Sequence, residues 1–228
     1  VREALLSDRA RRAGIPVVYV NQVGGQDELI FDGASTVVDG DGEVLARAPQ
    51  FVDDLMIVDL ELEPRGLEIA LPLVTIEPGA AAPSELPSID PPTIALELPP
   101  DAEVWEALRL GLADYFAKGG FTDACLGLSG GLDSALVAML AADALGAEHV
   151  HAVSMPSQHS SEHSRDDAAA LATNLGLDYR TIAIADVYGS FMGELAPSFE
   201  GTEADLTEEN LQARIRGTLV MALCNKFG

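Results

Sequence analysis

The sequence has 228 residues, of which 13 are basic and 37 acidic, so its formal net charge is −24. A field of that sign repels nucleic acid and anionic membranes, which argues against general binding to either, and no apolar run approaches the roughly 20 residues that cross a bilayer. The two cysteines, Cys125 and Cys224, are too few and too far apart for a disulfide framework or a CxxC metal site, which favours a reducing cytoplasm.

The first 60 residues predict the strand-rich end of a domain. Residues 2–13 have helical spacing that stops at Gly14, and residues 15–22 are short, apolar and β-branched, as in a buried strand. The further elements expected here are a turn–strand–turn unit over 24–35, a hairpin over 35–49 and an alternating strand over 53–62. These elements do not make up a whole domain.

Proline is dense between residues 61 and 100. It occurs at positions 64, 72, 78, 83, 87, 91, 92, 99 and 100. Because proline at this density blocks regular helix and sheet, we expect a semi-extended connector over this range.

Strands and helices alternate in the last part of the sequence. After an amphipathic helix over 101–120, we expect strands over 123–128, 149–156 and 178–184, and helices over 133–146, 164–176 and 206–228. Alternation of this kind predicts an α/β fold with a doubly wound parallel sheet.

The segment Ser129–Ser134, with the sequence SGGLDS, lies between the first of these strands and its following helix. Glycines let backbone N–H groups converge on an anion, and a helix N-terminus adds partial positive charge. Such local compensation is what a phosphate site requires in so acidic a chain. Asp133 would repel bare phosphate unless Mg²⁺ lay between them.

This S-G-G-x-D-S pattern resembles the pyrophosphate loop of N-type ATP pyrophosphatases, which cleave ATP between its α and β phosphates to adenylate a substrate. The resemblance implies ATP binding by the loop and by the segment after the second strand, with Asp133 as the Mg²⁺ ligand. The residues concerned are Gly127, Leu128, Ser129, Gly130, Gly131, Leu132, Asp133, Ser134, Ser154, Met155 and Pro156.

Two other stretches narrow the resemblance to the glutamine-dependent NAD synthetases. Residues 209–217, ENLQARIRG, resemble the substrate-binding helix of NAD synthetase, and residues 20–35 resemble the late part of its nitrilase-like glutaminase domain. The resemblance implies three segments: the end of an α/β/β/α nitrilase-like domain over 1–60, a linker over 61–100, and the first part of an adenine nucleotide alpha hydrolase-like synthetase domain over 101–228.

The family's reaction is ATP-dependent amidation of deamido-NAD to NAD through an adenylated carboxylate, with ammonia supplied by glutamine hydrolysis. The resemblance therefore implies ATP, deamido-NAD and glutamine or ammonia as ligands, and a closed homo-oligomer. Two alternatives stay open: another amidotransferase of this loop type, similar to GMP or asparagine synthetase, and an ATP-binding segment without turnover.

Within 206–228, helical spacing puts Asn210, Arg214 and Gly217 on one face, with Arg216 about 200° from Arg214. The face shared with Asn210 favours Arg214 as the partner of deamido-NAD. No catalytic residue is assigned, because residues 1–60 contain neither cysteine nor lysine and the family's Glu-Lys-Cys triad is expected upstream of Val1. Cys125 and Cys224 are expected to be packing thiols.

Overall fold

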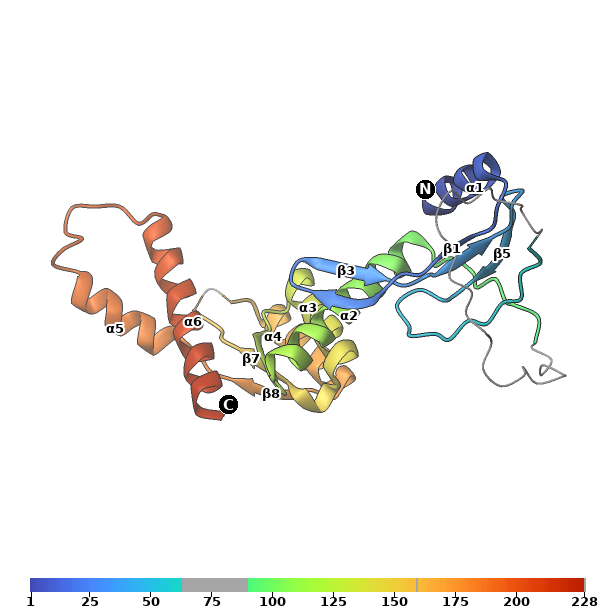
Figure 1. Cartoon of the computed structure of the whole chain (residues 1–228). Coiled ribbons are helices and arrows are strands. Elements are labelled where there is room, and N and C mark those ends of the chain that lie inside the picture. The colour runs from blue at the N-terminus through green and yellow to red at the C-terminus, as the bar shows by residue number, and fades with distance from the viewer. Residues whose placement is uncertain (63–89, 159, 228) are drawn as a thin grey trace. The chain divides into compact units, whose positions relative to one another are not determined.

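The computed structural model describes residues 1–62, 90–158 and 160–227 (Figure 1). The chain forms two compact units, which are described separately below. The first unit comprises Val1–Val23 and Phe31–Glu103, and the second comprises Gly24–Ile30 and Val104–Gly228. Each unit is therefore discontinuous in sequence, since the short segment Gly24–Ile30 belongs with the C-terminal half.

The first unit packs helix α1 (Arg2–Ala13) against an antiparallel sheet with the strand order β1-β4-β5. The strands are β1 (Val17–Tyr19), β4 (Thr36–Val38) and β5 (Val44–Arg47). Leu6, Ala10 and Val38 form the buried cluster between helix and sheet. Helix α1 ends at Gly14 in the left-handed conformation, where the sequence predicts the stop.

The hairpin expected over 35–49 is confirmed, since β4 and β5 are antiparallel neighbours. Asp39 closes its turn, because its backbone N–H donates to Glu43 O at 2.9 Å and its carboxylate accepts from the Asp41 and Glu43 N–H groups. Gly42 has a φ of 82°, and a Cβ there would lie 2.8 Å from Ser7 O of α1. The turn therefore requires glycine for its conformation and for its approach to the helix.

The strand expected over 53–62 is wrong, since these residues form no regular element. Their alternating pattern meets no partner strand, and Leu55 is 86 % exposed. Most of the expected connector, residues 63–89, lies outside the described residues. Within its described part, the segment after residue 89 pairs with β5, where Arg47 N–H donates to Thr93 O and Ala95 N–H donates to Arg47 O, each at 3.0 Å.

A two-stranded hairpin, β2 (Val23–Gln26) and β3 (Leu29–Asp32), lies against helix α2 (Pro100–Gly119), as Figure 1 shows. Sequence reasoning expected a turn where β2 forms. A Cβ on Gly25 would lie 3.1 Å from the Cα of Gly111 in α2, so two glycines allow the backbones to meet. Asp114 accepts the Gly25 N–H at 2.7 Å, and Lys118 donates to the Gly25 carbonyl.

The core of the second unit is a parallel sheet with the order β6-β7-β8, which confirms the predicted α/β class. Its strands are β6 (Ala124–Gly127), β7 (Val150–Ser154) and β8 (Asp178–Thr181). Helices α3 (Leu132–Leu145) and α4 (Glu162–Leu175) share one apolar cluster with the sheet, and α6 (Leu206–Phe227) shares another.

Two helix predictions in this unit were incomplete. Helix α4 begins at Glu162 and is capped by Ser161, whose hydroxyl accepts the Ser164 N–H at 3.1 Å, whereas the sequence suggested a start near Ser164. Helix α5 (Ala185–Leu195) was not predicted at all. It contains Gly189 and Gly193, which lower helix propensity and hide its pattern.

Candidate nucleotide-binding site

The SGGLDS segment lies at the carboxyl end of β6 and leads directly into α3. Leu128 anchors its beginning, because its side chain is buried and its backbone N–H donates to Val153 O on β7 at 2.9 Å. Gly131 is the N-cap of α3, so the first turn of that helix follows the loop at once. The loop is therefore fixed to the sheet at one end and to a helix N-terminus at the other.

Gly130 is the position where the loop most strictly requires glycine. Its φ is 82°, and a Cβ there would lie 2.0 Å from the Ser164 carbonyl oxygen. The backbone of the loop thus touches the first turn of α4. This contact holds two helix N-termini, those of α3 and α4, beside the same loop.

Serine hydroxyls occupy the inner side of the loop. Ser134 Oγ accepts the Ser129 N–H at 3.2 Å, and Ser129 Oγ accepts the Gly131 N–H at 3.2 Å. The two hydroxyls are 2.9 Å apart. Because hydroxyl hydrogens rotate freely, the Ser129 and Ser134 hydroxyls can donate to a phosphate oxygen when one is present.

The segment after β7 lies beside this loop, as the sequence predicts. Ser154 and Met155 are buried, and backbone hydrogen bonds from Ile182 N–H to Ser154 O (2.8 Å) and from Ile184 N–H to Pro156 O (3.0 Å) extend the sheet contact beyond β8. The segment is consequently held rigidly on its far side.

A cavity of about 520 Å³ opens where these segments meet. Its lining includes six of the predicted ATP-binding residues: Gly127, Leu128, Ser129, Ser154, Met155 and Pro156. Helix α6 contributes Arg216, Gly217 and Val220. Backbone amides, hydroxyls and guanidinium groups thus surround a hollow at the carboxyl ends of parallel strands, where open α/β sheets bind ligands.

The remaining predicted loop residues, Gly130–Ser134, continue past this cavity. Asp133 is exposed in the first turn of α3. Among the described residues no group of three or more His, Cys, Asp or Glu side chains could hold a metal ion.

Helix α6 presents Arg216, and not Arg214, to the cavity. Arg216 Nε donates to Met155 O at 3.1 Å, whereas the exposed Arg214 hydrogen bonds only to its own helix, at Asn210 O, among the interactions described. Asn210 and Arg214 do share one face, as expected. Their role toward deamido-NAD stays a prediction.

Sequence reasoning also missed three polar residues of the lining, Ser160, Ser164 and Arg165. Ser160 comes from the segment before α4, and Ser164 and Arg165 from the first turn of that helix. With Arg216, Arg165 supplies a second guanidinium at this wall. Two arginines provide the local positive charge that an anionic nucleotide requires in a chain of net charge −24.

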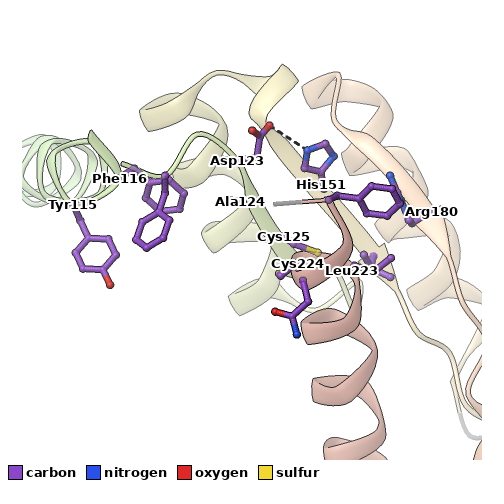
Figure 2. Close-up of a pocket in the computed structure, with 13 residues that line it drawn as sticks. Tyr115, Phe116, Asp123, Ala124, Cys125, His151, Arg180, Leu223 and Cys224 are labelled. Atoms are coloured by element: carbon purple, nitrogen blue, oxygen red, sulfur yellow. Dashed lines mark hydrogen bonds and ion pairs between the residues drawn. The ribbon is translucent and has the colours of Figure 1, made fainter. Parts of the chain in front are cut away.

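A second cavity, of about 680 Å³, lies near the opposite ends of the same strands (Figure 2). Its polar wall is an ion-pair network in which His151 bridges two carboxylates, with Nδ1 2.7 Å from Asp178 and Nε2 3.3 Å from Asp123. The hydrogen bond to Asp178 raises the pKa of His151. Arg180 also pairs with Asp178, and its guanidinium lies 5.7 Å from the ring centroid of Phe227.

None of the described helices is both long enough and apolar enough to cross a membrane.

Comparison with known families gives two matches along the chain. A model of the NAD synthase family matches residues 104–228, and a model of the carbon-nitrogen hydrolase family matches residues 1–66. The two matches occur in the order that the sequence resemblance predicts.

Individual relatives agree with the family matches. The chain is 44 % identical to the glutamine-dependent NAD(+) synthetase of Synechocystis over all of its own length and 37 % of the relative's. It is 43 % identical to the Thermotoga maritima enzyme of the same name, over 41 % of that protein. The structure of glutamine-dependent NAD+ synthetase from Acinetobacter baumannii with ADP superposes with a TM-score of 0.78 at 38 % identity, over 100 % of this chain and 39 % of that one. The chain thus spans about two fifths of these relatives.

Proposed function

Since the chain belongs to the NAD synthase family, we propose that the whole protein converts deamido-NAD to NAD in an ATP-dependent amidation. The observation that carries the proposal is the 520 Å³ cavity, where the loop after β6, the segment after β7 and Arg216 of α6 come together. The ADP bound by the Acinetobacter baumannii relative supports an adenine nucleotide as the ligand.

In this proposal the loop and the two arginines hold the triphosphate. Backbone N–H groups of Ser129 and Gly131, the Ser129 and Ser134 hydroxyls, and the N-terminus of α3 donate to phosphate oxygens. Asp133 would hold Mg²⁺, which supplies charge neutralisation at the phosphates when bound. The rigid segment Ser154–Pro156 positions the adenine side of the nucleotide.

The reaction needs positioning and charge stabilisation more than a protein nucleophile. The substrate carboxylate attacks the α-phosphorus of ATP and pyrophosphate leaves. Ammonia then attacks the adenylated carbonyl carbon, and AMP leaves as the amide forms. We propose Asn210 and Arg214 as contacts for deamido-NAD, which their exposed position on α6 leaves accessible to a ligand.

We propose that glutamine hydrolysis in the nitrilase-like part supplies the ammonia. The names of the relatives and the carbon-nitrogen hydrolase match over residues 1–66 support this source. The segment boundaries 1–60, 61–100 and 101–228, a closed homo-oligomer and a cytoplasmic location belong to the same proposal. Size-exclusion chromatography with light scattering tests the oligomer directly.

The test is product analysis of the full-length protein with ATP, Mg²⁺ and deamido-NAD, with either glutamine or an ammonium salt as nitrogen donor. We expect NAD, AMP and pyrophosphate in equal amounts. An amidotransferase that acts on another substrate, such as one similar to GMP or asparagine synthetase, would form AMP with its own substrate. It would form no AMP with deamido-NAD. A pure nucleotide binder would release neither AMP nor pyrophosphate.

Asp133→Asn sharpens this test. Loss of the carboxylate should lower the rate on the order of 100-fold and raise the Mg²⁺ concentration needed for half the maximal rate. Asp143→Asn is the matched control, because Asp143 lies on the same helix. Its carboxylate accepts the Trp105 Nε1–H at 2.8 Å, and the oxygen of an asparagine can accept the same hydrogen bond. Equal rates for the two variants would remove Asp133 from the proposed role.

A further inference from the structure

The structure brings together the two cysteines of the sequence, which lie 99 positions apart. Cys125 belongs to β6 and Cys224 to the end of α6, and both line the second cavity. Figure 2 shows the two side chains next to each other on its wall. Both are free thiols and only partly buried, so a small reagent in the cavity can reach them.

The packing of α6 on β6 determines the position of Cys224 relative to Cys125. Helix α6 lies against β6, and Leu219 and Leu223 pack on the same apolar cluster as Cys125. Leucines one turn apart set the rotation of the helix, which directs Cys224 toward the strand. Burial raises the pKa of the Cys125 thiol, and the neighbouring Cys224 thiol raises it further.

We propose that Cys125 and Cys224 form a thiol–disulfide modification site, closed by low-molecular-weight disulfides and opened by thiols. In the first step a cysteine thiolate attacks one sulfur of the reagent RSSR, and one RS⁻ leaves and takes up the proton. In the second step the other cysteine attacks the protein sulfur of the mixed disulfide, and a second RSH leaves. Two electrons pass to the reagent and both thiol protons end on its sulfurs.

The order of attack follows from the environment of Cys125. A raised pKa leaves little thiolate at neutral pH, so the first attack falls to Cys224. Once formed, the Cys125 thiolate is a strong nucleophile, because nucleophilicity rises with thiol pKa, and it resolves the mixed disulfide.

The bond would join two elements that both reach the nucleotide cavity. Strand β6 runs into the loop at Ser129, and α6 carries Arg216 two turns before Cys224. Oxidation therefore fixes α6 to the strand at the end remote from the cavity. The proposal is independent of the proposed function, since its test measures a covalent bond and needs no turnover.

The experiment exposes the folded 228-residue chain to oxidised glutathione and follows it by intact mass and peptide mapping. We expect an internal Cys125–Cys224 link, seen as the loss of two hydrogen atoms, with no lasting glutathione adduct. Dithiothreitol should reverse it. Glutathione adducts that persist on the wild-type chain, or disulfide-linked dimers in place of the internal link, would overturn the proposal.

Single variants separate the two steps. Cys125→Ser should hold a stable glutathione adduct at Cys224, and Cys224→Ser should form its adduct at Cys125 more slowly. Equal rates would contradict the assigned order.

The matched control moves one thiol around the helix. In Cys224→Ser/Lys226→Cys the thiol is displaced by about 200° on α6, to an exposed position outside the lining of the cavity, so the chain keeps two thiols. The internal link should be lost and glutathione adducts should remain. An internal link in this variant would show that proximity in the native fold does not select the pair.

Discussion

The strands of the β6-β7-β8 sheet present different side chains at their two ends, and we call the sheet borders at the carboxyl ends and at the amino ends the first and the second edge. At the carboxyl ends, glycines and serines expose backbone amides around a cavity, and two arginines from α4 and α6 complete its wall. At the amino ends, side chains pair with one another, as His151 does with Asp123 and Asp178. The first edge offers hydrogen-bond donors to a ligand. At the second edge the charged side chains form ion pairs with one another. Removing the side chain of Arg216 at the first edge should change ligand binding, whereas changes to the backbone of its loop, and to the ion pairs of the second edge, should change stability.

The largest effect is expected at Gly130. Gly130→Ala combines a left-handed residue, at about 1–2 kcal/mol, with a forced contact on the Ser164 carbonyl, at about 1–3 kcal/mol. Urea unfolding should therefore show a loss of roughly 2–5 kcal/mol.

Gly189→Ala on α5 is the control for Gly130, because a Cβ there meets nothing within 4 Å. It should gain about 0.5–1 kcal/mol. Equal responses of the two variants would show that the loop does not depend on its contact with α4.

Arg216 comes next. Arg216→Gln removes the guanidinium that bonds to Met155 O and should cost about 1.5–3 kcal/mol of interaction free energy, measured as weaker binding of an adenine nucleotide in calorimetry. Arg214→Gln leaves the cavity wall intact and should bind the nucleotide as the wild type does. A stronger effect at Arg214 would reverse this assignment.

The smallest effect is expected at the other edge, from pH. Asp178, and then Asp123, raise the pKa of His151 above its ordinary value of 6.5 in the folded state. The protonated form is thus favoured by folding, so its stabilisation is fully present below pH 6.5 and is lost as pH rises through the raised pKa. Urea unfolding should show that the free energy of unfolding declines as pH rises through this range, and that the decline is smaller in His151→Gln.

His149 also contacts Asp123, at 3.3 Å, and Arg180 pairs with Asp178, so both carboxylates keep a partner in the His151 variant. Hydrogen bonds lower the pKa of Asp123 and of Asp178, and the stability from these groups disappears only as pH falls through their folded values. The window assigned to His151 is therefore separate. If the free energy of unfolding declined by the same amount in His151→Gln, other groups would be responsible for the decline.

The sequence was sufficient for the loop and the parallel sheet, because both depend on local patterns. Residues 129–134 predict a glycine-rich loop between a strand and a helix, and short apolar strands alternate with helices around it. It was insufficient where tertiary packing decides. The buried Ile215 sets the rotation of α6, which carries its neighbour Arg216 to the cavity, and no spacing rule within the helix contains that information.

The missing strand over 53–62 has the same origin. Alternation of acidic and apolar residues makes a strand only beside a partner, and Ile57 remains 56 % exposed without one. Likewise, the start of α4 depends on which of two serines, Ser161 or Ser164, takes the capping geometry. Both residues are serine and can cap a helix, so the sequence alone does not choose between them; in the structure Ser161 is the cap, and Ser164 lies in the first turn against Gly130.

The hairpin of Gly24–Ile30 limits how the chain can be divided. It precedes the proline-rich stretch in sequence, yet its two glycines and the partners Asp114 and Lys118 make it part of the second unit. A gene fusion or an expression fragment cut at that stretch would leave α2 with a bare surface beside Gly111 and would strip the hairpin of its support. During evolution the two halves can therefore be exchanged between lineages only if the hairpin and α2 stay matched.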